Sequence, residues 1–152
     1  MPQTLADKVA LHAADDPDWR IADELNTPDA ATYGLKTVDA VVGDARALLM
    51  TSGAWGAICL TAEDTTKPLN VRGLCITTRD AHLTLSTIRM TDPATAMSIK
   101  SMVDSLQAVG LISATTHDAL LALGKAPASW ADINNNGVQV TARDVGLARG
   151  AV

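Results

Sequence analysis

Nearly half of this chain is hydrophobic, yet it contains no phenylalanine. Hydrophobic residues make up 47% of the composition and aromatic residues only 3%. The core must therefore be built from Leu, Val, Ile, Met and many Ala, with Trp19, Trp55 and Trp130 as its three large side chains. Small aliphatic residues on packing faces favour closely spaced helices. The composition therefore predicts a mainly α protein.

The length and polarity of the chain predict one folded domain. A chain of 152 residues fits one domain better than two, and folding at this length buries roughly 68–70% of the surface of the unfolded chain. Charged residues make up 19% of the composition, which is typical of an ordered chain. We expect a single helical domain over 1–152, with a flexible C-terminal tail at 149–152.

Capping residues and apolar spacing predict a compact bundle of about six to eight short helices. The clearest is the helix over 93–109, which Thr91 or Asp92 caps, Pro93 begins and Gly110 ends. The other predicted helices cover residues 4–15, 18–25, 39–50, 55–62, 69–80, 113–123 and 141–149, with a short turn after Ser129.

Local turn signals support several of these boundaries. Thr4 with Asp7, and Thr141 with Asp144, have the spacing of capping boxes in their Asp form. The run of three asparagines and a glycine at 134–137 predicts a turn. Residues 27–35 are expected to form a loop.

The sequence allows at most a minimal two-stranded pairing. The segments 36–38 and 138–140 are both short, extended in character and followed by a capped helix, and we expect them to pair with each other. The window 82–90 alternates apolar and polar residues as a strand would, but it has no obvious partner strand. We expect the preceding helix to continue to about residue 87, followed by an extended segment.

The charge of the chain argues against non-specific nucleic-acid binding. The formal net charge is −5, and the twelve Lys and Arg residues form no run, whereas such binding needs clustered cations. The N-terminal stretch is the acidic pole of the sequence. It is either a solvated face or a patch that meets a basic partner surface. The candidate interface residues are Asp15, Asp16, Asp18, Trp19, Asp23, Glu24 and Arg149.

Two cysteines, Cys59 and Cys75, lie among apolar residues, and buried free thiols are the expected state for such a pair. No run approaches 18 apolar residues, and charges at Asp7, Lys8 and Asp15 interrupt the first fifteen residues. The sequence therefore predicts neither a signal peptide nor a membrane span.

No motif of catalysis or metal binding is found. His12, His82 and His117 are scattered, and none has the helical spacing from another His or Cys that a zinc site needs. The segment 132–137 begins like a calcium loop, but Arg143 stands where the loop needs a glutamate. A helix-turn-helix interpretation of 21–26 fails because no basic recognition helix follows. We predict no catalytic residue, no metal and no cofactor.

Several short motifs resemble small helical proteins encoded among the structural genes of tailed bacteriophages and prophages. In the C-terminal third these are residues 110–112, 115–124, 128–132, 138–145 and 148–149; further matches are 21–27, 52–55 and 91–93. The likeness touches most of the chain, although each motif is short. In that group Arg is common where Trp130 stands.

The resemblance implies a structural, non-catalytic virion component at the neck, the head-tail connection or the tail. Such a protein would be made in the host cytoplasm and would contact other phage structural proteins in a homo-oligomeric ring or another symmetric assembly. The alternative is a cytoplasmic assembly adaptor or chaperone that is not retained in the particle. A small enzyme is the third possibility, but no pair of acid and base residues has the required spacing.

Overall fold

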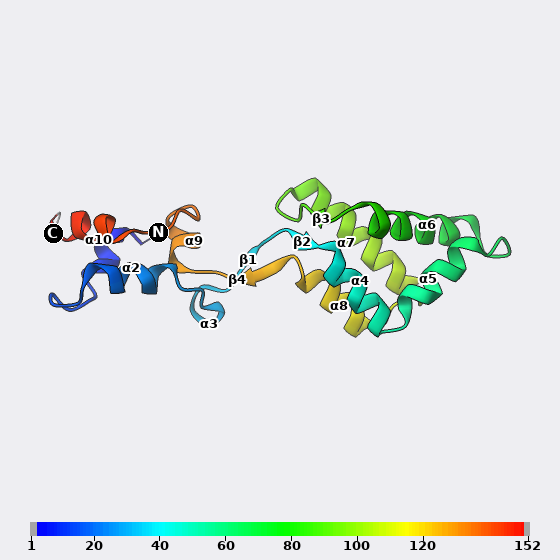
Figure 1. The fold of residues 1–152 in the computed structure, drawn as a ribbon, viewed down its shortest axis with the longest axis horizontal. Helices are drawn as coiled ribbons and strands as arrows, with labels where there is room; N and C mark the ends of the chain where they lie inside the picture. Colours follow the sequence, from blue (N-terminus) through cyan, green and yellow to red (C-terminus); the bar gives the residue numbers. More distant parts are fainter. Residues whose placement is uncertain (1–2, 151–152) are drawn as a thin grey trace. The chain divides into compact units, whose positions relative to one another are not determined.

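The mainly α fold class is confirmed. The computed structural model describes residues 3–150, and this part of the chain contains ten helices and two small two-stranded sheets (Figure 1). It divides into two compact units: unit 1 joins both chain ends, Met1–Lys36 and Pro127–Val152, and unit 2 is Thr37–Ala126. The single domain over 1–152 stays a prediction.

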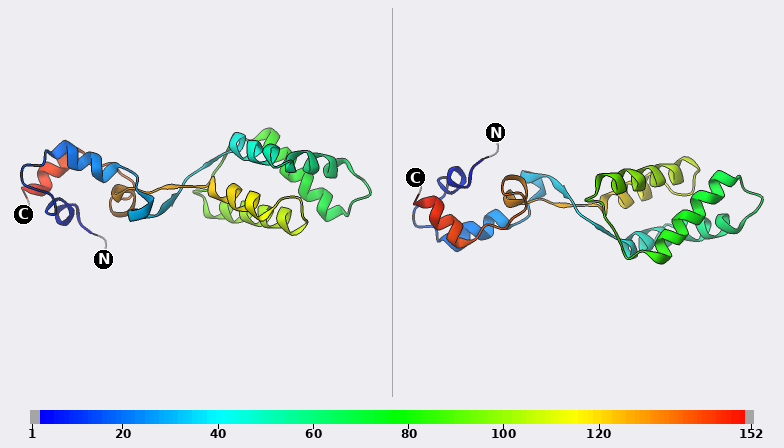
Figure 2. Two further views of the ribbon diagram at one scale, coloured as in Figure 1. Left: turned by 90° about the horizontal axis from the view of Figure 1, so that it is seen from below. Right: turned by 90° about the horizontal axis from the view of Figure 1, so that it is seen from above.

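Unit 1 is built by helices from opposite ends of the sequence. Its helices are α1 (Leu5–Val9), α2 (Asp18–Asn26), α3 (Ala30–Tyr33), α9 (Trp130–Asn134) and α10 (Ala142–Arg149). The C-terminal α10 lies against both α2 and α1 (Figures 1 and 2). The first helix is shorter than the predicted 4–15, and α3 begins in a segment that was predicted to be a loop. Asp29 explains α3, because its carboxylate accepts hydrogen bonds from the N–H groups of Ala31 and Thr32.

The core of unit 1 is formed by residues of α1, α2, α9 and α10, together with Val140 before α10. Its buried residues are Val9, Ile21, Ala22, Leu25, Trp130, Ala131, Val140, Val145 and Ala148. Burial of each large side chain contributes about 1.5–3 kcal/mol. Trp130 is a core residue as predicted, whereas the prediction for Trp19 is wrong because its side chain is exposed.

Unit 2 contains the longest helices. Its elements are β2 (Ala40–Val41), α4 (Val42–Thr51), α5 (Ala54–Glu63), α6 (Leu69–Thr84), β3 (Thr87–Ile88), α7 (Pro93–Ala108) and α8 (Ala114–Ala122). Helices α5 and α6 lie side by side (Figures 1 and 2). The core residues are Leu49, Ala54, Ile58, Ala62, Cys75, Val103, Leu106 and Ile112, with Trp55 packed against them.

Both cysteines of unit 2 are free thiols. Cys75 is fully buried on α6, and Cys59 is half-buried on α5. Burial, reinforced by the neighbouring Cys59, raises the pKa of the Cys75 thiol. The expected buried free thiol is therefore confirmed for Cys75.

The predicted pairing of 36–38 with 138–140 is wrong. The first segment belongs to β1 (Leu35–Thr37), whose partner is β4 (Lys125–Pro127); the chain passes from one unit to the other within these two strands. The segment ending at Val140 is not a strand, because the side chain of Asn26 satisfies its backbone. Val140 N–H donates to Asn26 Oδ1 over 2.8 Å, and Asn26 Nδ2 donates to the Val140 carbonyl over 2.7 Å.

The structure of residues 82–90 also differs from the prediction. Helix α6 ends at Thr84 and not near residue 87, and β3 then pairs antiparallel with β2, with Ala40 opposite Ile88 and Val41 opposite Thr87. A partner strand of only two residues leaves no periodic pattern in the sequence.

Candidate functional site

The predicted interface residues all lie in unit 1. Asp15 and Asp16 are in the turn before α2, and Asp18, Trp19, Asp23 and Glu24 are on α2. Arg149 is the last residue of α10, so it is not part of a flexible tail; residues 151–152 of the predicted tail lie outside the described part of the chain.

The Arg149 guanidinium holds the two ends of the chain together. Its Nη1 donates to Asp18 Oδ1 over 2.7 Å, and its Nη2 donates to the carbonyls of Ala13 and Asp16. The ion pair is partly buried, with 29% of the Arg149 side chain and 35% of the Asp18 side chain exposed. Arg149 and Asp18 are therefore structural residues that contact each other, although the sequence predicted both to face a partner.

We expect the substitution Arg149→Met to lower the free energy of unfolding by about 1–2 kcal/mol. Hydrogen bonds to charged groups contribute roughly 1.5–3 kcal/mol, and partial exposure weakens the ion pair. Urea unfolding followed by circular dichroism measures the loss. Arg143→Met is the matched control, because Arg143 is exposed on the same helix and makes no ion pair in residues 3–150. Equal losses in both variants would contradict the assignment.

The side chain of His12 lies close to the carboxylates of Asp16 and Glu24. Its Nδ1 is 3.7 Å from Asp16 Oδ2, and its Nε2 is 3.8 Å from Glu24 Oε1, with only 13% of the imidazole side chain exposed. Asp16 is also 3.5 Å from the exposed Arg20. The negative charge of Asp16 is therefore partly neutralised by Arg20. The only ionic partner of Glu24 in the described residues is His12, and that contact is ionic only with a protonated imidazole.

An exposed acidic surface remains after these contacts are assigned. Asp15 and Asp23 form no ion pair in the described part of the chain, and both are exposed. Trp19 is 66% exposed and lies one helical turn from Asp23, so the two share a face of α2. We call Asp15, Trp19, Asp23 and Glu24 the acidic face.

Leu147 extends this face from the neighbouring helix. Helices α2 and α10 are antiparallel, because Arg149 meets Asp18 at one end and Val140 meets Asn26 at the other. A Cβ on Gly146 would lie 2.9 Å from Asp18 Oδ2, so these two residues face each other. In antiparallel helices, the residues that follow two facing positions turn to the same side of the pair.

Trp19 and Leu147 are those following residues, and Leu147 is 65% exposed. They therefore lie on the same side of the helix pair. Two large apolar side chains, with Asp23 one turn from Trp19 and the exposed Arg143 one turn from Leu147, make this side of unit 1 suitable for contact with another macromolecule. Sequence reasoning missed Leu147, although its place outside the stripe of Val145 and Ala148 could have indicated exposure.

A second cluster of ionisable groups lies on unit 2, and its members form hydrogen bonds with one another. His117 Nε2 is 2.8 Å from Asp104 Oδ1, and its Nδ1 is 2.8 Å from Asp118 Oδ1. Lys100 donates to the other oxygen of Asp104 over 2.6 Å. Hydrogen bonding to Asp104, and then to Asp118, raises the pKa of His117. Because both ring nitrogens have partners, the arrangement joins α7 to α8 and leaves neither nitrogen for a substrate.

The calcium-like segment 132–137 consists of the last residues of α9 and the turn that follows, and a salt bridge to Asp132 holds it. Lys36 Nζ lies 2.8 Å from Asp132 Oδ1, and the other oxygen of Asp132 accepts from Ser129 in a capping box. Positive φ angles at Asn136 and Gly137 confirm the predicted turn. Hydrogen bonding from Lys36 lowers the pKa of the Asp132 carboxyl. No group of three or more His, Cys, Asp or Glu residues placed to hold a metal ion occurs within 3–150.

Comparison with known proteins identifies no relative. No protein-family model matches the chain, and no match is found among curated proteins or solved structures. Among the described helices, none is long and apolar enough to cross a membrane.

Proposed function

We propose that the chain is a structural, non-catalytic component of a tailed-phage virion, placed at the neck, the head-tail connection or the tail. The resemblance of its short motifs to phage structural-cluster proteins supports this placement. The acidic face supports action through protein contacts, because it combines an exposed indole with Asp15 and Asp23, which form no ion pair in the described residues. In this proposal the chain forms a ring or another symmetric assembly with phage structural proteins.

The exposed Trp19 is the observation that carries the proposal. Tryptophan is among the residues that dominate binding energy at protein interfaces, where it fills a desolvated pocket surrounded by weaker contacts. The surrounding carboxylates select the partner by charge: unit 1 has nine Asp and Glu residues against five Lys and Arg, whereas unit 2 has eight against seven. The complementary surface is therefore basic, with an apolar depression for Trp19 and Leu147.

Mass spectrometry of purified particles from the source phage or prophage tests the placement. A fixed ratio of this chain to the major capsid protein, between a few and some dozens of copies per particle, is the expected result. A chain that is abundant in the lysate and absent from particles would contradict the virion placement and would support the assembly adaptor or chaperone.

The interface is tested by competition between variant and wild-type chains for the same particles. When both are co-expressed at equal levels, we expect Trp19→Ala to be incorporated at least about tenfold less than wild type, since loss of a central tryptophan costs about 2 kcal/mol or more. Asp23→Lys should also be disfavoured, with a defect that weakens as salt is raised. The control is Leu60→Ala, which removes a 75% exposed leucine from unit 2. Equal incorporation of Trp19→Ala and wild type would show that the acidic face is not the contact.

A further inference from the structure

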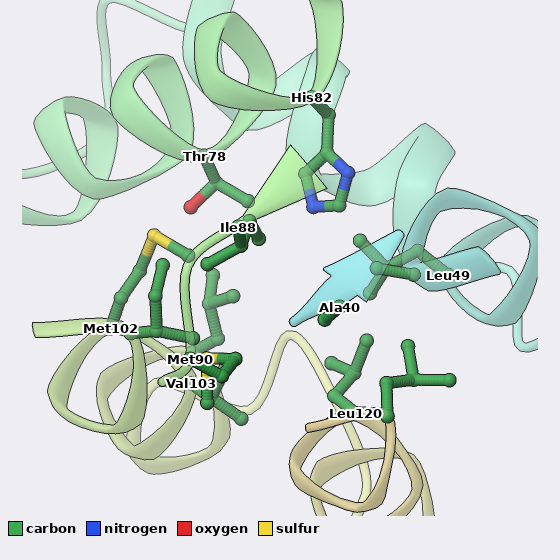
Figure 3. Close-up of a pocket in the computed structure, with 13 residues that line it drawn as sticks. Ala40, Leu49, Thr78, His82, Ile88, Met90, Met102, Val103 and Leu120 are labelled. Carbon is green, nitrogen blue, oxygen red and sulfur yellow. The ribbon is translucent and has the colours of Figure 1, made fainter. Parts of the chain in front are cut away.

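His82 is a buried histidine that points into an apolar cavity of unit 2. It lies near the end of α6 with 5% of its surface exposed. Figure 3 shows its imidazole directed away from α6, between Ile88 and Leu49, into a cavity of about 30 Å³. The cavity walls come from β2, α4, β3, α7 and α8, so the ring lies where most elements of unit 2 meet.

The surroundings of His82 offer almost nothing to a charge. Its Nδ1 is buried and has no hydrogen-bond partner. Thr78 is the other polar residue that lines the cavity, and its hydroxyl already donates to the Leu74 carbonyl over 2.8 Å. The residues that line the cavity from the other elements are Ala, Leu, Ile, Val and Met and carry no ionisable group.

The charged neighbour of His82 has the wrong sign to stabilise an imidazolium ion. The imidazole meets Trp55 of α5 edge-on, with ring centroids 5.4 Å apart and planes inclined by 72°. Arg46 of α4 lies over the same indole, 5.9 Å from the ring centroid. Burial, together with the charge of Arg46, lowers the pKa of His82, while a hydrogen bond with the backbone of Val42 opposes the shift. No carboxylate contributes to this shift.

We propose that His82 acts as an acid-sensitive latch that holds α6 against β2 and α4 while its imidazole is neutral. Protonation places a positive charge beside Arg46 in an apolar cavity, where it has no counter-ion. The cavity is large enough for one water molecule, and the His82 ring and Thr78 are the polar side chains that line it as partners for that water. Uptake of the proton therefore favours hydration of the cavity and separation of α6 from its neighbours.

The direction of the pH effect follows from linkage. The folded-state pKa of His82 lies below the unfolded-state value of about 6.5, so its neutral form is favoured by folding. The packing of α6 is thus unaffected by His82 above about pH 6.5 and weakens as the pH falls below that value. One proton is taken up on opening, so the opening equilibrium increases at most about tenfold per pH unit. His117 acts in the opposite direction, because its pKa is raised.

Hydrogen exchange of the full chain tests the latch. Protection factors of α6 amides, corrected for the intrinsic effect of pH, are compared at pH 7.5 and pH 5.0 by mass spectrometry. Wild type should lose protection in α6 at pH 5.0, by up to about tenfold per pH unit below about 6.5. His82→Leu, which is neutral and apolar, should keep the same α6 protection at both values.

Two further variants complete the experiment, one as a second neutral replacement of His82 and one as a control at His117. His82→Gln provides a second neutral side chain should His82→Leu not fold, and it should also lack the pH response. His117→Asn should retain the wild-type response of α6. The proposal is overturned if wild type shows no loss of α6 protection at pH 5.0, if both His82 variants lose as much as wild type, or if His117→Asn alone abolishes the response.

Discussion

Replacing Trp130 with alanine is expected to lower the free energy of unfolding of unit 1 by about 3–5 kcal/mol. Trp130 begins α9, is 2% exposed and packs in the core with residues from both ends of the chain, including Leu25 and Val145. The other buried residues of this core are aliphatic side chains and alanines, none of which is as large as an indole, and Tyr33 packs against them only partly buried. The substitution therefore leaves a cavity in addition to the lost apolar burial.

Urea unfolding measures this loss, and hydrogen exchange in α2 and α10 locates it. Trp130→Phe is expected to lose less than Trp130→Ala, because it keeps an aromatic ring and removes an indole N–H that has no hydrogen-bond partner. Trp19→Ala is the control of identical chemistry at an exposed position, and it should change stability by no more than about 0.5 kcal/mol. A loss below about 1 kcal/mol for Trp130→Ala would mean that unit 1 collapses around the vacated space.

Under the proposed relationship to phage structural proteins, arginine would be common at the place of Trp130. An arginine here would put a charge among Ala22, Leu25 and Val145. Such a charge is costly without a buried partner. The core of unit 1 therefore accounts for the tryptophan in this chain.

The predictions that were confirmed depend on contacts within a few residues of sequence. The capping boxes at Thr4 and Thr141 are present, and Asp92 caps α7 with Pro93 at its first position. Gly110 has the positive φ expected after that helix. A cap joins a side chain to a backbone group about three residues away, so its whole geometry is contained in the local sequence.

The features that could not be predicted join residues far apart. Asp18 and Arg149 are separated by 131 positions, and the Asn26 amide reaches Val140 across 114. Neither pairing has a periodic signature, since each is one side chain meeting one group. The assembly of unit 1 from both ends of the chain depends on such contacts, so it could not be predicted from local patterns in the sequence.

The wrong prediction for Trp19 has a different cause, because the spacing of apolar residues in α2 indicates its exposure. Ile21, Ala22 and Leu25 define the buried stripe of α2, and Trp19 lies outside it. The size of the indole favours a core position, but the helical position of Trp19 decides its exposure. The sequence places Trp19 among acidic residues, and the structure brings Trp19 and Asp23 together on one face of α2. Arg149, in contrast, makes an internal contact with Asp18.

The substitution Leu106→Ala in unit 2 is expected to lower the free energy of unfolding by about 3–5 kcal/mol, in the upper part of the range for leucine-to-alanine changes. Leu106 is 1% exposed on α7 and lines the cavity beside His82. The new void would join the existing 30 Å³ cavity. The cost rises by roughly 24 cal/mol for each Å³ of residual cavity. Leu60→Ala, at an exposed position, is the control in the same unfolding measurement.

Benzene then distinguishes an open void from a collapsed one. A dry apolar cavity of sufficient size binds benzene, and binding to the folded state raises its stability. Benzene should therefore raise the melting temperature of Leu106→Ala and leave wild type unchanged, because the wild-type cavity is too small for the ring. Met90 and Met102 line the same cavity and have flexible thioether chains. If they fill the space, the loss of stability would be smaller than expected and benzene would have no effect, which would contradict the prediction.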